Sequence, residues 1–119
     1  MVTRTQCLAR AAFVSIEARN EARKLDKDFR SFAKSFPALI HACGLAQAVA
    51  FALAKKHNDY LGDLIEVLKD VGHSRITSPA ELRRLVCELD VSAYLRLSRD
   101  ALDAAGWLKR YVEALAEDH

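Results

Sequence analysis

The chain has 119 residues, about half of them hydrophobic and 29% charged, with a formal net charge of +2. This length fits one domain with a core of its own, and the balance of apolar and charged residues excludes a disordered chain. Alanine and leucine dominate while β-branched residues are few, which favours helices over strands.

The first predicted element is a long helix that ends near Leu25. Its apolar residues recur at steps of three and four, and we expect a buried face made of Cys7, Ala11, Val14, Ala18, Ala22 and Leu25. Asp26 then predicts the N-cap of a short second helix. The apolar side of that helix is predicted to contain Phe29, Phe32, Ala33 and Phe36.

A third helix is predicted to begin at Pro37, where the missing N–H costs nothing, and to run to about Lys56. No charged side chain occurs from residue 35 to residue 54. We interpret this run as a central helix packed on all sides rather than a membrane span. Within it, Gly44 is predicted to permit a close helix approach, and Gln47 to be a buried hydrogen-bonding residue, with a place in a functional site as the alternative for both. His41 is predicted to be a core or interface residue.

Asn58 predicts the N-cap of a fourth helix, which Gly72 ends. Its inward residues are predicted to be Leu61, Leu64, Ile65 and Leu68. The segment Ser78-Pro79-Ala80-Glu81 has the pattern of a capping box and predicts the start of a fifth helix.

Residues 90–97 are predicted to form a short connecting turn, and Ser98 to cap the last helix. Gly106 lies within that helix and predicts a close contact with another helix. The inner face is predicted to contain Leu102, Ala105, Leu108, Val112 and Leu115. Together these elements predict an all-α fold, a single compact bundle of about five to seven helices, as one domain over residues 1–119.

A row of cations follows the first two helices at spacings of four, four, three and four: Arg19, Arg23, Lys27, Arg30 and Lys34. On continuous helical geometry they fall within an arc of roughly 80°. Such a row can follow a phosphate backbone, and Lys55 and Lys56 add cations at the end of the next helix. The alternative is a solvated helix face, and spacing alone does not choose between them. The phenylalanines are assigned to the core, so we expect no aromatic platform for bases.

The charges are unevenly distributed between the two halves of the chain. Residues 1–60 carry ten Lys or Arg against five Asp or Glu, and residues 61–119 carry eight against eleven. This suits a protein that presents one end to an anion and the other to a protein neighbour, although uneven charge without a partner is the alternative.

No pattern of a catalytic or metal site is visible. The three cysteines are widely separated and the four histidines are scattered, without the spacing of metal ligands. We interpret the cysteines as reduced packing residues of a cytoplasmic protein. Glycine-rich phosphate loops, serine elbows and paired carboxylates are likewise missing from the sequence. We therefore expect no enzyme activity, no metal and no cofactor.

Three patches of residues resemble a known family in their order and spacing. They are Phe29-Arg30-Ser31, Lys34, Phe36-Pro37, Leu39-Ile40, Gly44-Leu45, Gln47, Phe51 and Lys55; then Tyr94-Leu95 and Leu97-Ser98; then Trp107-Leu108-Lys109-Arg110-Tyr111. Covering most of the chain, they resemble the small α-helical subunit of the type III-B (Cmr-module) CRISPR effector, an RNA-guided complex that destroys RNA. The family often carries an asparagine just before Gly44, where this chain has His41-Ala42-Cys43.

The resemblance implies a small non-catalytic bundle that joins a larger ribonucleoprotein and has no membrane partner. Its implied partners are CRISPR RNA and target RNA, the backbone and large subunits of the Cmr-type effector, and copies of itself stacked as a short filament. RNA cleavage is implied to belong to the backbone subunit. With the cation row, the resemblance predicts RNA-backbone contacts at Arg23, Lys27, Arg30, Lys34, Lys55 and Lys56, and weaker RNA or partner contacts at Arg19, Lys109 and Arg110.

The sequence also suggests a surface for contact between copies and two alternative functions. The acidic surface around Asp63, Glu66 and Asp70 is predicted to face the basic part of the next copy. A free-standing helical nucleic-acid-binding regulator is an alternative function, in which the loop of residues 72–77 leads to Arg83 and Arg84. A small helical ribonuclease using His41 or His57 is a further one.

Overall fold

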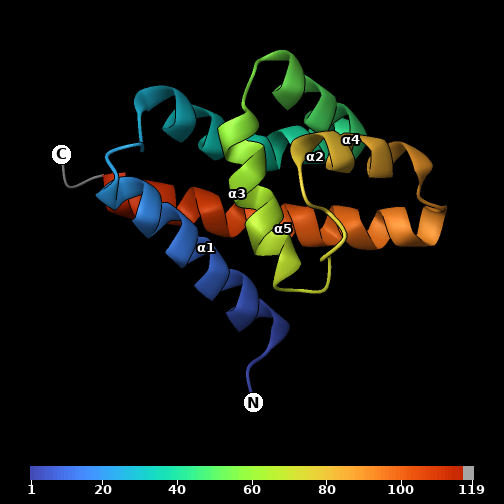
Figure 1. Cartoon of the computed structure of the whole chain (residues 1–119), viewed down its shortest axis with the longest axis horizontal. Helices are drawn as coiled ribbons and strands as arrows, with labels where there is room; N and C mark the ends of the chain where they lie inside the picture. Colours follow the sequence, from blue (N-terminus) through green and yellow to red (C-terminus); the bar gives the residue numbers. More distant parts are fainter. Residues whose placement is uncertain (117–119) are drawn as a thin grey trace.

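Five α-helices make up the part of the chain that the computed structural model describes, residues 1–116. They are α1 (Arg4–Glu21), α2 (Lys27–Ala54), α3 (Asn58–Lys69), α4 (Pro79–Glu88) and α5 (Val91–Ala116), and Figure 1 shows their arrangement. Residues 1–116 contain no strand. The predicted all-α bundle of about five to seven helices is confirmed.

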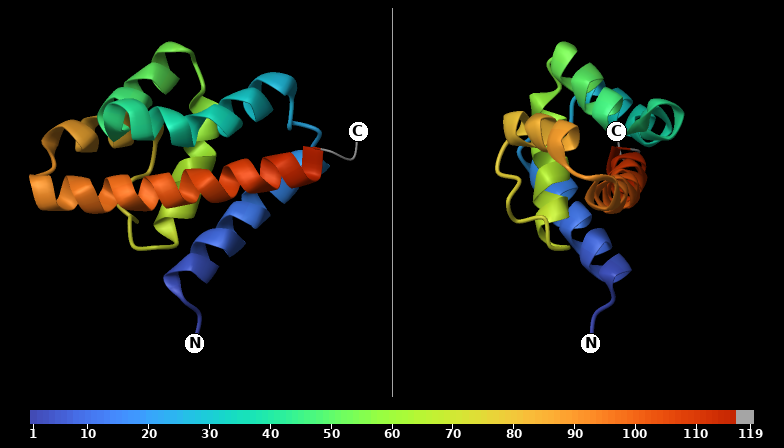
Figure 2. Two further views of the ribbon diagram at one scale, coloured as in Figure 1. Left: turned by 180° about the vertical axis from the view of Figure 1, so that it is seen from behind. Right: turned by 90° about the vertical axis from the view of Figure 1, so that its right-hand side faces the viewer.

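The long helix α5 is the element against which most of the bundle packs. It contacts α1, α2 and α3, while α4 packs against α2 and α3. Figure 2 shows α2 lying along α5 and α1 crossing it obliquely. One continuous core joins the helices, and its largest fully buried side chains include Leu8, Ile16, Phe29, Phe36, Leu45, Tyr60, Leu61, Leu64, Leu82 and Leu97.

Helix α1 buries a different face from the predicted one. The buried residues are Leu8, Ala12 and Ile16, whereas Val14 of the predicted face is 62% exposed. Both faces repeat at helical spacing, and alanine fits a core or a surface equally well. The larger Leu8 and Ile16 side chains decide the orientation, because they gain more than alanine when they leave water.

Helix α2 begins as predicted, with the Asp26 carboxylate accepting a hydrogen bond from the Phe29 N–H at 2.8 Å. The predicted helix start at Pro37 is wrong, because α2 runs through Pro37 and is interrupted at Gly44 instead. Gly44 has φ +86° and ψ 162°, a backbone conformation that glycine adopts without steric cost. The hydroxyl of Tyr94 on α5 accepts the Ala46 N–H at 3.0 Å. A side chain of α5 thus caps the second segment of α2.

The sequence analysis predicted that the uncharged run of α2 is packed on all sides. The structure shows that it is not. His41 and Gln47 are exposed, which makes the prediction of a buried Gln47 wrong, and Phe51 is 44% exposed. By length and composition α2 is apolar enough to cross a membrane. Here it is interrupted at Gly44 and packs against α3, α4 and α5.

Helices α3 and α4 follow the sequence closely. The four predicted inward residues of α3 are all buried: Leu61, Leu64, Ile65 and Leu68. Asn58, the predicted N-cap, is instead the first residue of α3. At the start of α4 the Ser78 hydroxyl accepts the Glu81 N–H at 3.1 Å, and Pro79 occupies the first helical position, as predicted.

Helix α5 is longer than predicted. It begins at Val91, and the Asp90 carboxylate accepts the Ala93 N–H at 2.9 Å, so the predicted cap at Ser98 is wrong. A Cβ added at Gly106 would meet no other heavy atom of the described residues within 4 Å. The predicted close helix contact at Gly106 is therefore also wrong. Of the predicted inner face, Ala105, Leu108 and Val112 are fully buried.

Candidate nucleic-acid interface

Three of the predicted cations lie on the outer face of the first segment of α2. Phe29, Phe32, Ala33 and Phe36 of this segment are buried. Because Lys27, Arg30 and Lys34 occur three and four residues apart on the opposite side, burial of the aromatic face turns them outward. With Ser31 and Ser35 they line a shallow hollow of about 470 Å³.

The end of α2 brings a fourth cation to the same place. Lys55 and His57 line a second hollow, of about 360 Å³, together with Asp28, Phe32, Ser31 and Ser35. The two hollows share the last two of these residues, the serines, and are therefore adjacent. The His57 ring stacks on Phe32 with centroids 3.8 Å apart, which fixes the chain just after Lys55.

The six predicted RNA-contacting cations are Arg23, Lys27, Arg30, Lys34, Lys55 and Lys56. Four of them, Lys27, Arg30, Lys34 and Lys55, line the two hollows, and we call these four the basic face. None of the six forms an ion pair within the part of the chain that the structure describes. Arg23 lies in the link between α1 and α2 with φ +60°, and Lys56 follows α2 with φ +63°. Unpaired cations remain free to bind an external anion, and those grouped on one face attract the same polyanion.

Arg19 is separated from this face. Its guanidinium donates two hydrogen bonds to Asp63, Nε to Oδ2 at 2.9 Å and Nη2 to Oδ1 at 3.1 Å. Its Cζ atom also lies 4.2 Å from the centroid of the Phe29 ring. The hydrogen bonds that it donates to Asp63 raise the pKa of Arg19. This pair joins α1 to α3, so neither Arg19 nor Asp63 is a free surface charge; Glu66 and Asp70 are exposed.

The two weaker candidates on α5 lie apart from the basic face. Arg110 lines a third hollow, between α1 and α5, that also includes Thr5, Gly106 and Trp107. Lys109 is half-buried. Neither residue lines the hollows of the basic face.

Phe51 was missed by the sequence analysis, which assigned every phenylalanine to the core. Its exposed ring lies beside Lys55, whose Nζ atom is 5.8 Å from the ring centroid, and it stacks parallel to Phe32 with centroids 6.4 Å apart. The signal in the sequence is the spacing of four between Phe51 and Lys55. That spacing places both on one side of the last turn of the helix.

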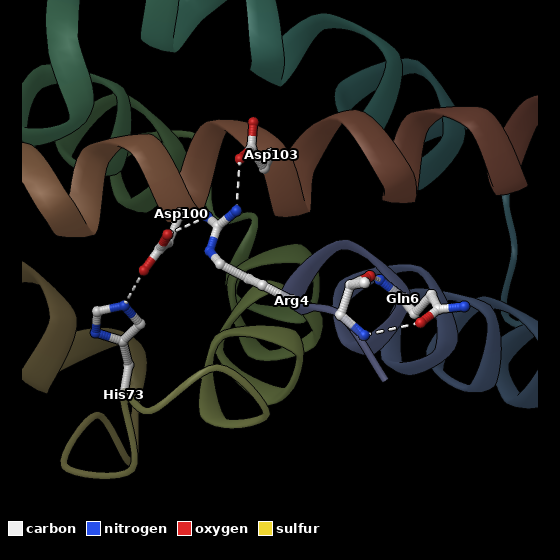
Figure 3. Close-up of polar contacts among 6 residues, drawn as sticks. Arg4, Gln6, His73, Asp100 and Asp103 are labelled. Carbon is white, nitrogen blue, oxygen red and sulfur yellow. Dashed lines mark hydrogen bonds and ion pairs between the residues drawn. The ribbon is translucent and has the colours of Figure 1, made fainter. Parts of the chain in front are cut away.

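A cluster around Asp100 has the residue types of acid–base chemistry, but its bonds are directed inward (Figure 3). Asp100 is 4% exposed. One carboxylate oxygen accepts a hydrogen bond from Arg4 and the other lies 2.7 Å from Nε2 of His73. Arg4 also binds Asp103 at 3.1 Å. Because both Asp100 oxygens are occupied, the cluster joins α1, α5 and the loop before α4 rather than offering a free acid or base.

Metal ligands are not gathered anywhere in residues 1–116: no group of three or more His, Cys, Asp or Glu side chains is placed to hold an ion. The three cysteines are free thiols.

Comparison with known proteins gives one consistent result. The model of the CRISPR-associated protein family Cas_Cmr5 matches residues 4–115. The CRISPR system Cmr subunit Cmr5 of Thermus thermophilus is 37% identical over 123 residues, which span 99% of this chain and all of that protein. The crystal structure of a CRISPR-associated Cmr5 family protein from the same organism matches with a TM-score of 0.80 and 34% identity, over 97% of this chain and 98% of that one.

Proposed function

This chain belongs to the Cmr5 family of CRISPR-associated proteins, and from that membership we propose that it is the small subunit of a type III-B, Cmr-type CRISPR effector complex. In this role it binds the backbone and large subunits, stacks with copies of itself in the cytoplasm, and contacts guide or target RNA. It supplies no catalytic group, and RNA cleavage belongs to the backbone subunits.

The observation that supports the RNA contact is the convergence of Lys27, Arg30, Lys34 and Lys55 on two adjoining hollows. These cations have no acidic partner among the described residues, so they can neutralise phosphates and release counterions. The Ser31 hydroxyl at the centre can donate a hydrogen bond to a phosphate oxygen, whereas the Ser35 hydroxyl already donates to the Phe32 carbonyl at 3.0 Å. Such contacts position RNA without reading its sequence.

The proposal is tested by assembling the complex with a charge-reversed basic face. The K27E/K34E variant is expected to enter the complex but to weaken its hold on target RNA. The matched control is R75E/R83E, which makes the same charge change at two exposed arginines on the loop before α4 and on α4. If complexes containing either variant retained target RNA equally well, the proposed RNA contact of the basic face would be wrong. Failure of the wild-type chain to enter the complex would remove the subunit role.

The alternative of a free-standing regulator gains no support from α4, its proposed recognition helix. Arg84 is engaged by Glu81 and by Glu88, whose Oε1 lies 2.6 Å from Nη1, on the surface of the same helix. Of the two arginines, Arg83 alone is unpaired within residues 1–116. Sequence-specific protection of a DNA duplex in a footprint would favour this alternative instead.

A further inference from the structure

Phe51, near the end of α2, is the one aromatic side chain among the large hydrophobic residues that are exposed in residues 1–116. The others are aliphatic: Met1, Val2, Val14, Val91 and Leu95. Single exposed aliphatic side chains are common on protein surfaces. An open aromatic face can also stack with another planar ring, so Phe51 offers a contact that the aliphatic residues cannot make.

Neighbouring rings hold Phe51 in one orientation. Its ring lies parallel to that of Phe32, with an angle of 5° between the planes and 6.4 Å between the centroids. Phe32 is 6% exposed and stacks in turn on His57. Because Phe32 belongs to the packed core, the side chain that lies against it has little freedom left to lose when a ligand binds.

The exposed ring adjoins the basic face. Phe32 and Lys55 both line the smaller of the two hollows, and Phe51 lies beside both, so its ring is at the edge of that hollow. Nζ of Lys55 is 5.8 Å from the Phe51 centroid, near the outer limit of a cation–π contact. The flexible lysine side chain can therefore leave the ring and bind a phosphate group beside it.

The charges near the ring favour an anionic partner. The two hollows are lined by the cations Lys27, Arg30, Lys34 and Lys55 and by one carboxylate, that of Asp28. The four cations form no ion pair within residues 1–116. The surface therefore keeps an excess of positive charge. A partner that fits it has several negative charges along its length and flat apolar rings beside them, as single-stranded RNA does.

An acidic protein segment matches this surface less well. It would need several acidic residues in register with the cations, whereas RNA carries one charge on every nucleotide. Aliphatic side chains of a protein would gain no stacking on the flat Phe51 ring, whereas a base would. RNA is therefore the partner that uses both the charges and the ring.

We propose that Phe51 stacks against a base of single-stranded RNA while the cations of the basic face bind the flanking phosphates. The inference rests on the RNA contact of the proposed function and names the kind of RNA that this contact accepts. A base must leave its neighbours in the strand to stack on the ring, which costs least where the nucleotide is unpaired. Every base has a flat face, so the contact favours unpaired RNA without reading its sequence.

Fluorescence anisotropy with two labelled probes tests the inference. The probes are a short oligouridine and an abasic ribose-phosphate strand of the same length. The wild-type chain is expected to bind the oligouridine about five- to a hundredfold more tightly, because only that probe has bases to stack. F51L keeps an apolar contact with Phe32 but removes the flat face, so it is expected to lose this preference. F51W retains a flat face and is expected to retain the preference.

The salt dependence of binding separates stacking from charge. F51L is expected to keep the wild-type slope of log affinity against log salt concentration, because it leaves every cation in place. A shallower slope in F51L would overturn the inference, since the ring would then act by holding Lys55.

F13L is the matched control. Phe13 on α1 is a partly exposed ring that contacts Tyr111, with centroids 5.3 Å apart, and it lines neither hollow of the basic face. F13L is expected to leave the binding of both probes unchanged. Unchanged melting temperatures confirm that both leucine variants fold, and the comparison of the two probes on the wild type requires no variant.

The inference is overturned if the wild type binds both probes equally well, or binds neither at low salt. It is also overturned if F51L retains the full preference for oligouridine. The same holds if F51L binds RNA normally but no longer enters the effector complex, since the ring then contacts a protein. If K27E/K34E weakens the hold on target RNA and F51L does not, the proposed RNA contact stands and the stacked base alone is wrong.

Discussion

The guanidinium of Arg19 and the carboxylate of Asp63 form a two-bond ion pair, with N–O distances of 2.9 and 3.1 Å, that ties α1 to α3. Each side chain is only 16% exposed. The pair separates Arg19, a cation with a structural role, from Arg23, Lys27, Arg30 and Lys34, which the sequence had placed in a single row with it.

We expect R19A to destabilise the fold by about 2 kcal/mol, because it leaves the largely buried Asp63 carboxylate without its donor. Urea denaturation measures the change. The exposed Lys27 provides the comparison, since K27A should stay within about 0.5 kcal/mol of the wild type. Equal effects of the two substitutions would show that the pair does not join the helices.

The hydroxyl of Tyr94 caps the second segment of α2, so Y94F is expected to cost about 1 kcal/mol by leaving the Ala46 N–H unpaired. Y60F removes the same atom at a site where the hydroxyl is buried without a partner among the described residues. There we expect no loss or a small gain in stability, because a buried unpaired hydroxyl is unfavourable. Thermal melting of the two variants side by side checks both, and a stability loss in Y60F as large as in Y94F would contradict this explanation.

Two glycines provide another matched pair. Gly44 has a φ of +86°, so G44A is expected to destabilise by about 1–2 kcal/mol. Gly106 lies inside α5, and a Cβ there meets nothing within 4 Å in the described structure, so G106A is expected to stabilise by about 0.5–1 kcal/mol. Chemical denaturation distinguishes the opposite signs. A tolerated G44A would mean that α2 is not interrupted there.

Stability should fall in acid because of Asp100. Burial on its own raises the pKa of this carboxyl, but hydrogen bonds from His73 and Arg4 outweigh it and hold the pKa below its usual value. A lowered pKa in the folded state stabilises the protein above the unfolded value of about 3.9. This contribution is lost as pH falls below about 4 and through the folded value.

The D100N variant is expected to lose about 1–3 kcal/mol at neutral pH and much of this acid sensitivity. Urea denaturation from about pH 2 to about pH 7 measures both the stability loss at neutral pH and the dependence of stability on acid. D103N serves as the control, since Asp103 is more exposed and has one bond to Arg4. An acid response in D100N as steep as in the wild type would assign the effect to other carboxylates.

Local signals in the sequence predicted much of the fold. Asp26 and Ser78 cap helices as expected, because a capping side chain and the N–H groups it serves lie within one turn. The apolar residues of α3 are large and lie on one side only, so their periodicity has one solution.

The errors arose where a distant contact decides. On α1 two apolar faces compete, and Leu8 rather than Val14 faces the core. The interruption of α2 is at Gly44 because Tyr94, which lies 48 positions beyond Ala46, caps the segment after it. Spacing rules for helices relate residues within a few turns, so they cannot predict a contact between Ala46 and Tyr94.

The cations illustrate the same division between local and distant causes. Those of α2 lie together on its outer side, as their spacing predicted, because Phe29 and Phe36 orient the helix. Arg19 instead pairs with Asp63, and this pair depends on how α1 packs against α3. Local spacing in the sequence does not predict that packing.

The salt dependence of RNA binding tests the central claim most directly. The logarithm of the affinity for single-stranded RNA, plotted against the logarithm of salt concentration, has a slope of about −0.7 per neutralised phosphate. The basic face therefore predicts that K27E/K34E binds more weakly and with a slope shallower by about 1.4. R75E/R83E should keep the wild-type slope, and a slope in K27E/K34E equal to that of the wild type would contradict the account.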